Sequence, residues 1–172
     1  APTIFERAQK FNIKSALFSS KLKTIKVLSR GADIALSPEI ATTSWINAVG
    51  TVPDKYTADV NYWTCRALIY TLKTRPDIGL YYLHTTDYPM HMWKANDARS
   101  LNHMNTLDSL LGVMAQVAPD AAILVTADHG MNDKHLADGS PDVLYLEPLF
   151  DGLLGAGQAR VGDAPPPAGR DP

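Results

Sequence analysis

The 172-residue chain is 45% hydrophobic and 20% charged, which is typical of a globular domain with a substantial core. Its formal net charge of −2 provides no basic surface for electrostatic binding of nucleic acid or of an anionic membrane. The single cysteine, Cys65, excludes an internal disulfide framework and is predicted to be a small buried side chain on an apolar helix face.

The first half of the sequence alternates short apolar runs with stretches of helical periodicity. Capping and turn residues separate these stretches, and Pro76 disfavours a helix at the residue before it. The pattern predicts, in chain order, a helix at 3–11, a strand at 14–18, a helix from about 20, a strand at 33–36, an irregular connection at 37–54 and a helix at 57–74.

Two apolar runs dominate the second half: IGLYYL within residues 77–84 and AAILVT at residues 121–126. Neither alternates with polar residues, so both are predicted to be central strands covered on two faces. Between them, residues 95–117 repeat apolar side chains at helical spacing, and a further short strand is expected at residues 143–146. Strands that alternate with helices favour parallel pairing. The predicted fold class is therefore α/β, with three α/β/α layers around a mostly parallel sheet.

The end of the chain differs from the rest. Residues 162–172 are rich in proline and glycine and are predicted to form a disordered tail after one domain at residues 1–161. No apolar run approaches the roughly 18 residues of a membrane span, and no signal-like segment opens the chain. No membrane partner is expected, and a cytoplasmic location is the default expectation.

Polar residues that could carry chemistry follow both predicted central strands, at the strand ends where ligands gather in open α/β sheets. Asp87 follows the first, and Pro89 suits the first turn of a new helix that would carry His91. Asp128 and His129 follow the second, and the next residue is a glycine that lets both side chains turn towards one ion. Aspartate and histidine are zinc ligands, and two such pairs predict two metal ions that favour an oxyanion substrate. The alternative is that these acids cap helices and the histidines are core or surface groups.

The motif order resembles the alkaline phosphatase superfamily, and within it the phosphonoacetate hydrolases and the type I phosphodiesterase/nucleotide pyrophosphatase proteins. The most specific stretches are TTDYPMH and VTADHGMNDK, and the resemblance runs from about residue 3 to residue 161. It implies an alkaline phosphatase-like catalytic domain that binds two Zn²⁺. One zinc would be held by Asp87 and His91, and the other by Asp128 and His129.

The resemblance also implies a substrate site. In phosphonoacetate hydrolases a Lys-x-Lys segment grips the carboxylate of the substrate, and Lys21 and Lys23 provide that spacing just past a strand end. The alternative for this pair is a solvated helix start. Asn132 lies close enough in sequence to the second pair of predicted metal ligands, Asp128 and His129, to line the substrate pocket. His84 and His103 are predicted to be structural.

Three residues of the family pattern have no counterpart in this sequence. A metal-binding Asp and a Thr or Ser nucleophile would precede Ala1, so the N-terminal strand region of the family is absent. A further metal-binding His would lie in a C-terminal segment, and no histidine follows His135. The expectation is therefore a partial catalytic domain from a longer protein, and a chain that is inactive by itself because the nucleophile is absent.

Three functions are left open. The first is zinc-dependent hydrolysis of a phosphonate or phosphate ester by the intact protein, with phosphonoacetate converted to acetate and phosphate as the preferred reaction. The second is a phosphodiesterase or nucleotide pyrophosphatase, and the third is a non-catalytic metal-binding remnant. The expected partner is a small anionic phosphonate or phosphate substrate, and a homodimer is left open.

Overall fold

The computed structural model describes residues 1–158 and 160, so the predicted tail at 162–172 lies outside the described residues. The chain divides into two compact units, residues 1–132 and the residues from 133 onward, and each is described by itself. No helix in the described part of the chain is long and apolar enough to cross a membrane. The elements are α1 (Ile4–Gln9), β1 (Lys14–Ser19), α2 (Leu22–Leu28), β2 (Ile34–Leu36), a 3-10 helix η1 (Pro38–Ile40), α3 (Thr43–Val49), α4 (Asp59–Thr74), β3 (Ile78–His84), α5 (Tyr88–Met92), α6 (Ala98–Val117) and, in the second unit, α7 (Leu146–Leu154).

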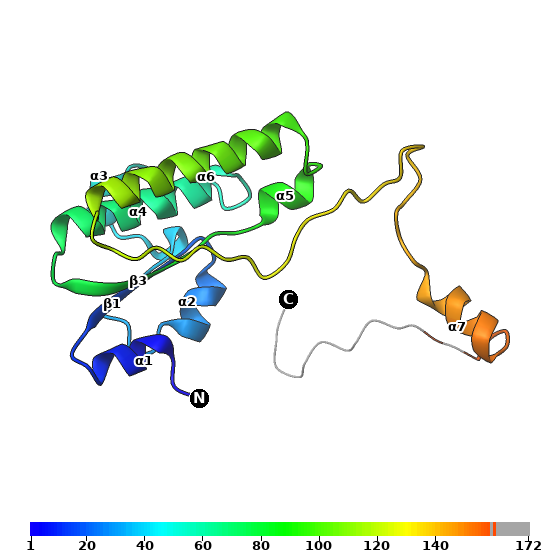
Figure 1. Ribbon diagram of the computed structural model, residues 1–172, viewed down its shortest axis with the longest axis horizontal. Helices are drawn as coiled ribbons and strands as arrows, with labels where there is room; N and C mark the ends of the chain where they lie inside the picture. Colours follow the sequence, from blue (N-terminus) through cyan, green and yellow to red (C-terminus); the bar gives the residue numbers. More distant parts are fainter. Residues whose placement is uncertain (159, 161–172) are drawn as a thin grey trace. The chain divides into compact units, whose positions relative to one another are not determined.

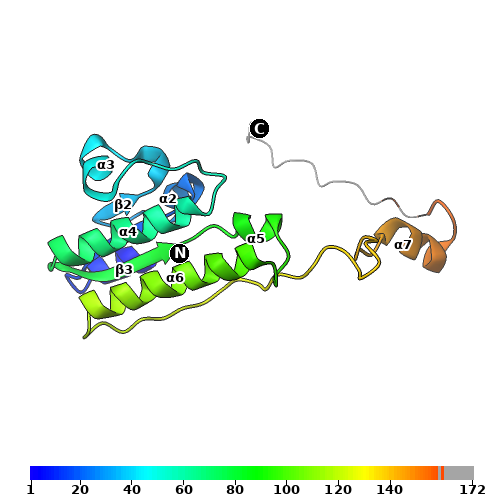
Figure 2. The ribbon, with the colours of Figure 1, turned by 90° about the horizontal axis from the view of Figure 1, so that it is seen from above.

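The first unit is built on a three-stranded parallel sheet in the order β2-β1-β3. Side chains of the central strand β1 alternate between the two faces. Ala16 and Phe18 lie in the larger buried cluster with Trp63 of α4, whereas Leu17 lies in a smaller cluster with Phe5 of α1. Helices α3, α4 and α6 cover one face of the sheet, and α1 and α2 cover the other (Figures 1 and 2). The predicted three-layer α/β/α fold with a parallel sheet is confirmed.

Helix α4 is the central helix of the larger cluster and contacts both the sheet and α6. Cys65 lies in its buried face, as predicted. Burial raises the pKa of the Cys65 thiol to about 12, so the thiol stays protonated and unreactive at neutral pH. Cys65 is therefore a packing residue.

The predicted central strand at residues 121–126 is wrong. The described segment forms no strand, and its apolar side chains are exposed, with Leu124 91% accessible. As a result, β3 lies at an edge of the described sheet and not in its centre. An apolar run supplies strand propensity, but a strand forms only when a neighbouring strand accepts its backbone hydrogen bonds and its side chains find a surface to cover.

Two further expectations are wrong for local reasons. The connection at 37–54 contains helix α3, which ends at Gly50 with a positive φ of 108° that glycine adopts easily. The strand expected at residues 143–146 is not formed, and α7 begins at Leu146. Pro148 falls in the first turn of α7, a position that proline favours because its missing N–H has no helical partner there.

Gly31 lies in the turn between α2 and β2, and we expect Gly31→Ala to destabilise the first unit by about 1–3 kcal/mol. Its φ is +89°, and a Cβ at this position would lie 2.6 Å from the backbone nitrogen of Glu6 in α1. The change in the free energy of unfolding is measured by urea denaturation.

Gly112→Ala is the matched control, because Gly112 lies in α6 with nothing within 4 Å of an added Cβ. Alanine is the better helix former, so this control should be neutral or stabilising by up to about 1 kcal/mol. Equal destabilisation by the two substitutions would contradict the importance of the close approach to α1.

Candidate active site

The carboxyl ends of β1 and β3 lie side by side because the two strands are parallel and Ser19 pairs with His84. The residues that follow these strands therefore meet at one edge of the sheet. Lys21 follows β1, and Asp87 follows β3. Their side chains are in contact: the Lys21 Nζ lies 3.4 Å from Asp87 Oδ1.

Asp87 is the N-cap residue of α5, and Pro89 occupies the first turn of this helix. His91 lies one turn further along, and its Nε2 is 2.9 Å from Asp87 Oδ2. The structure thus brings together the first predicted pair of metal ligands. It does so in the way that the sequence indicates, with the acid at the start of the helix and the histidine four residues later.

His129 approaches the same carboxylate from the segment that follows α6. Its Nε2 lies 3.8 Å from Asp87 Oδ2 and 3.9 Å from Asp128 Oδ2. Its Nδ1 donates a hydrogen bond of 2.8 Å to the Gly130 carbonyl, which leaves Nε2 facing the acids. Metal-bound histidines are commonly held in this way, with one ring nitrogen on a carbonyl and the other on the metal. Asp128 is less constrained, since its side chain is 92% exposed.

The other predicted site residues occupy the periphery. Lys23 is exposed in the first turn of α2, and Asn132 is exposed at the end of the first unit. Lys21 is more firmly placed, because the Ser19 hydroxyl donates to its carbonyl (3.0 Å) and accepts from its N–H (3.1 Å). The same hydroxyl lies 3.0 Å from Nδ1 of His84. His84, predicted to be structural, therefore takes part in the contacts that hold Lys21.

Neighbouring charges set the protonation of the central groups. Partial burial disfavours the charged form of Asp87, but Lys21 and His91 outweigh it and hold its pKa below the usual value. The hydrogen bond to the Gly130 carbonyl, with the charges of Asp128 and Asp87, raises the pKa of His129. Burial, and then Lys21, lower the pKa of His84. Asp87 is therefore an ionised carboxylate at neutral pH, which is the form that binds a metal.

Asp87, His91 and His129 carry oxygen and nitrogen donors of the kind that zinc accepts. Ligands of a tetrahedral zinc at about 2.0–2.1 Å lie about 3.3 Å from one another. The distances from Asp87 Oδ2 to the Nε2 atoms of His91 and His129, 2.9 and 3.8 Å, lie on either side of that value. Within residues 1–158 and 160, however, no group of three or more His, Cys, Asp or Glu side chains is arranged to hold a metal ion. The described residues supply ligand pairs but no complete ligand set.

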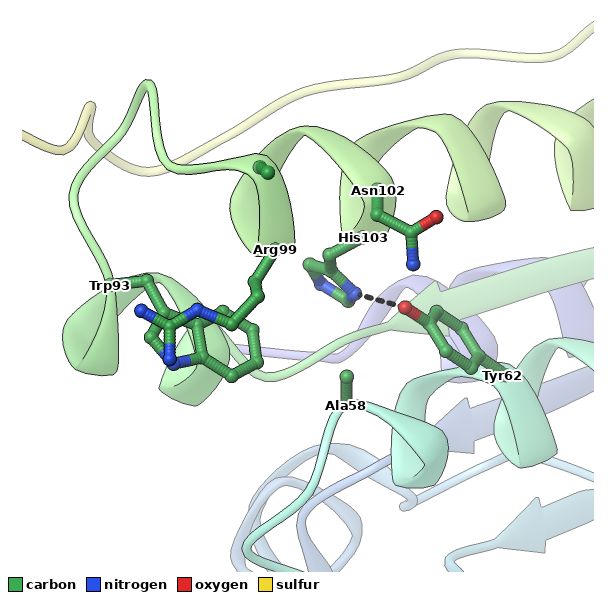
Figure 3. A pocket seen from close by; sticks show the side chains of 7 residues that line it. Ala58, Tyr62, Trp93, Arg99, Asn102 and His103 are labelled. Carbon is green, nitrogen blue, oxygen red and sulfur yellow. Dashed lines mark hydrogen bonds between the residues drawn. The ribbon is translucent and has the colours of Figure 1, made fainter.

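A pocket of about 320 Å³ lies between α4 and the start of α6 (Figure 3). His103, buried on α6, faces the Tyr62 hydroxyl of α4 across a distance of 2.8 Å from Nδ1. In the first turn of α6, the Arg99 guanidinium lies over the Trp93 ring, 5.1 Å from its centre. This pocket was not predicted from the sequence, because it is formed where α4 and α6 pack together and its lining residues come from separate parts of the chain. The lining residues are Ala58, Tyr62, Trp93, Ala98, Arg99, Asn102 and His103.

Sequence reasoning also missed Asn61. Its side chain is fully buried on α4 and hydrogen-bonds the backbone of Thr86, the residue before Asp87. An asparagine within a helix usually faces solvent, so only the tertiary packing of α4 against the end of β3 identifies its role.

The structure thus gathers Lys21, Asp87 and His91 at the carboxyl edge of a parallel α/β sheet, where open α/β folds bind their ligands. The chain belongs to the type I phosphodiesterase/nucleotide pyrophosphatase family, which residues 2–151 match. The family membership predicted from the motifs is confirmed.

Two solved structures resemble the chain closely, and both are of the phosphonoacetate hydrolase from Sinorhizobium meliloti 1021. In the complex with phosphonoformate, the identity is 32%, the TM-score is 0.72, and the match covers 90% of this chain and 41% of that one. In the complex with phosphonoacetate, the identity is 34%, the TM-score is 0.72, and the coverage is 93% and 42%. This chain therefore spans about two fifths of the length of those hydrolase chains.

Proposed function

We propose that the protein hydrolyses a phosphonate or phosphate ester in a zinc-dependent reaction, and that its preferred reaction converts phosphonoacetate to acetate and phosphate. The observation that carries the proposal is the convergence of His91 and His129 on one carboxylate oxygen of Asp87, with Lys21 on the other oxygen. The likeness to a hydrolase solved with phosphonoacetate supports the substrate class.

Two zinc ions would be held by this chain, one by Asp87 with His91 and one by Asp128 with His129. When bound, they supply positive charge that stabilises the attacking and leaving groups of a displacement at phosphorus. The chain prepares these ligands in two ways. Asp87 is kept ionised by its neighbours, and His129 is kept with Nε2 towards the acids by its bond to the Gly130 carbonyl.

Hydrolysis of phosphonoacetate adds water across the P–C bond, so that oxygen joins phosphorus and a proton joins the methylene carbon. In our proposal, Lys21 and Lys23 bind the substrate carboxylate through charge-assisted hydrogen bonds, and Asn132 lines the pocket. Lys21 can exchange Asp87 for the substrate carboxylate with little loss of free energy, since its pair with Asp87 is partly exposed to solvent.

The resemblance places the nucleophile outside this sequence, so we propose that the 172-residue chain by itself is inactive.

The lysine pair provides the test of the substrate. We expect Lys21→Ala combined with Lys23→Ala to weaken binding of phosphonoacetate to the zinc-loaded chain about tenfold or more, because two charged donors to its carboxylate are lost. Binding is measured by isothermal titration calorimetry, and zinc affinity is measured on the same samples. Lys26→Ala is the control, because Lys26 is exposed in the last turn of the same helix. Equal affinities in the wild type and the double variant would exclude this carboxylate site.

Two alternatives rest on particular observations. The matched family includes nucleotide pyrophosphatases, and such an enzyme would release nitrophenol from a nitrophenyl nucleotide ester and ignore phosphonoacetate. A non-catalytic metal-binding remnant accords with the lack of a three-residue metal group among the described residues. Measurable turnover of either substrate by the zinc-loaded intact protein would exclude the remnant.

A further inference from the structure

Asn61 makes a paired contact with the backbone of Thr86. Its Nδ2 donates to the Thr86 carbonyl at 2.7 Å, and its Oδ1 accepts from the Thr86 N–H at 2.8 Å. Both bonds are buried: Asn61 is 0% exposed and Thr86 is 4% exposed. One side chain of α4 thus satisfies both backbone groups of a residue that lies beyond the end of β3.

This contact fixes the short turn between β3 and α5. Strand pairing with β1 stops at His84, so Thr86 has no strand partner in the described sheet. The next residue is Asp87, whose carbonyl accepts the first hydrogen bonds of α5 from Met90 and His91. The position of the Asp87 carboxylate therefore depends on a backbone segment that Asn61 holds on one side and α5 holds on the other.

A second layer holds Asn61 itself. Its Nδ2 lies 3.5 Å from Nε2 of His103, and Nδ1 of His103 lies 2.8 Å from the Tyr62 hydroxyl. Burial lowers the pKa of His103, so the ring is neutral and offers one donor and one acceptor. With the proton on Nδ1, the ring accepts from Asn61 and donates to Tyr62. The amide of Asn61 is therefore oriented with its nitrogen towards the Thr86 carbonyl and the histidine.

We propose that Asn61 is a positioning residue for the candidate metal ligand Asp87, acting through the backbone of Thr86 and supported by His103 and Tyr62. The proposal rests on the proposed zinc-dependent function. A buried amide with both ends engaged holds a backbone position more narrowly than apolar packing does, because hydrogen bonds are directional and leaving either end unmade is unfavourable. Substitution of a residue that hydrogen-bonds and orients a metal ligand typically lowers metal affinity about 10–100-fold.

The test compares variants of the full 172-residue chain by two measurements: amide hydrogen exchange and competition for zinc with a chromogenic chelator. We expect Asn61→Ala to speed exchange of the Thr86 and Met90 amides about tenfold or more and to weaken zinc binding about 10–100-fold. Exchange at Leu17, in the buried centre of β1, should change far less. Thr71→Val is the matched control, since Thr71 is buried on α4 and its hydroxyl donates to the Ala67 carbonyl of the same helix.

Asn61→Asp keeps the size of the side chain and an acceptor for the Thr86 N–H. It provides the test of the positioning role if the alanine variant does not fold. It should preserve protection of Thr86 better than the alanine variant and weaken zinc binding less. The proposal is wrong if a folded Asn61 variant leaves both the exchange of Thr86 and the zinc affinity unchanged, or if Thr71→Val weakens zinc binding equally. If the exchange changes as expected but the wild type binds no zinc, the proposed function fails and the positioning of Asp87 by Asn61 stands.

Discussion

Asp87→Asn is expected to weaken zinc binding by the chain about a hundredfold or more. Asp87 contacts both His91 and His129, and the substitution replaces an ionised carboxylate with a neutral amide of the same size. Loss of a residue that hydrogen-bonds a metal ligand typically lowers metal affinity about 10–100-fold, so loss of the ligand itself should lower it at least as much. Zinc affinity is measured by competition with a chelator of known affinity.

Asp108→Asn controls for the loss of one negative charge from the same unit, because Asp108 is exposed on α6. It should leave zinc affinity within about twofold of the wild type, since an exposed charge is screened by solvent. If Asp87→Asn behaves like Asp108→Asn, the convergence of side chains on Asp87 is not a zinc site, and the proposed function loses its main support.

Trp63→Ala is expected to lower the free energy of unfolding of the first unit by about 3–5 kcal/mol. Trp63 is 1% exposed, packs in the larger cluster between α4 and the sheet, and donates from its indole nitrogen to the Gly50 carbonyl at 2.8 Å. Its removal leaves a cavity and an unmatched carbonyl at the end of α3. Urea denaturation followed by circular dichroism measures the change.

Phe11→Ala is the matched control for loss of an aromatic side chain, because Phe11 is exposed after the end of α1. Its effect should stay within about 0.5 kcal/mol. Similar losses from the two substitutions would mean that the cluster around Trp63 does not dominate the stability of the first unit.

The parts of the fold that the sequence predicts are those in which local pattern and burial agree. The strand at 14–18 and the helix at 57–74 were predicted within two residues of β1 and α4, because their apolar residues are both periodic and buried. Residues 121–126 show the limit of this reasoning. Their composition is that of a buried strand, but strand formation depends on a partner edge, and a single run of residues carries no information about that edge.

The candidate site divides in the same way. Asp87 and His91 were predicted to face one point because they lie four residues apart across a helix start marked by Pro89, a purely local relation. His129 reaches Asp87 although the strand expected to deliver it is not formed. Asn61 could not be found from the sequence, since its partner Thr86 is 25 residues away and the contact exists only after α4 packs on the sheet.

The two oxygens of Asp87 face different neighbours. Oδ2 lies towards the histidines and Oδ1 towards Lys21, so a single carboxylate joins the proposed zinc ligands to the proposed anion-binding lysine. Zinc affinity and anion affinity are then thermodynamically linked, and whatever factor a bound anion contributes to zinc affinity, bound zinc must contribute to anion affinity. For the same reason, the effects of substituting Asp87 and Lys21 together should not be the sum of their separate effects.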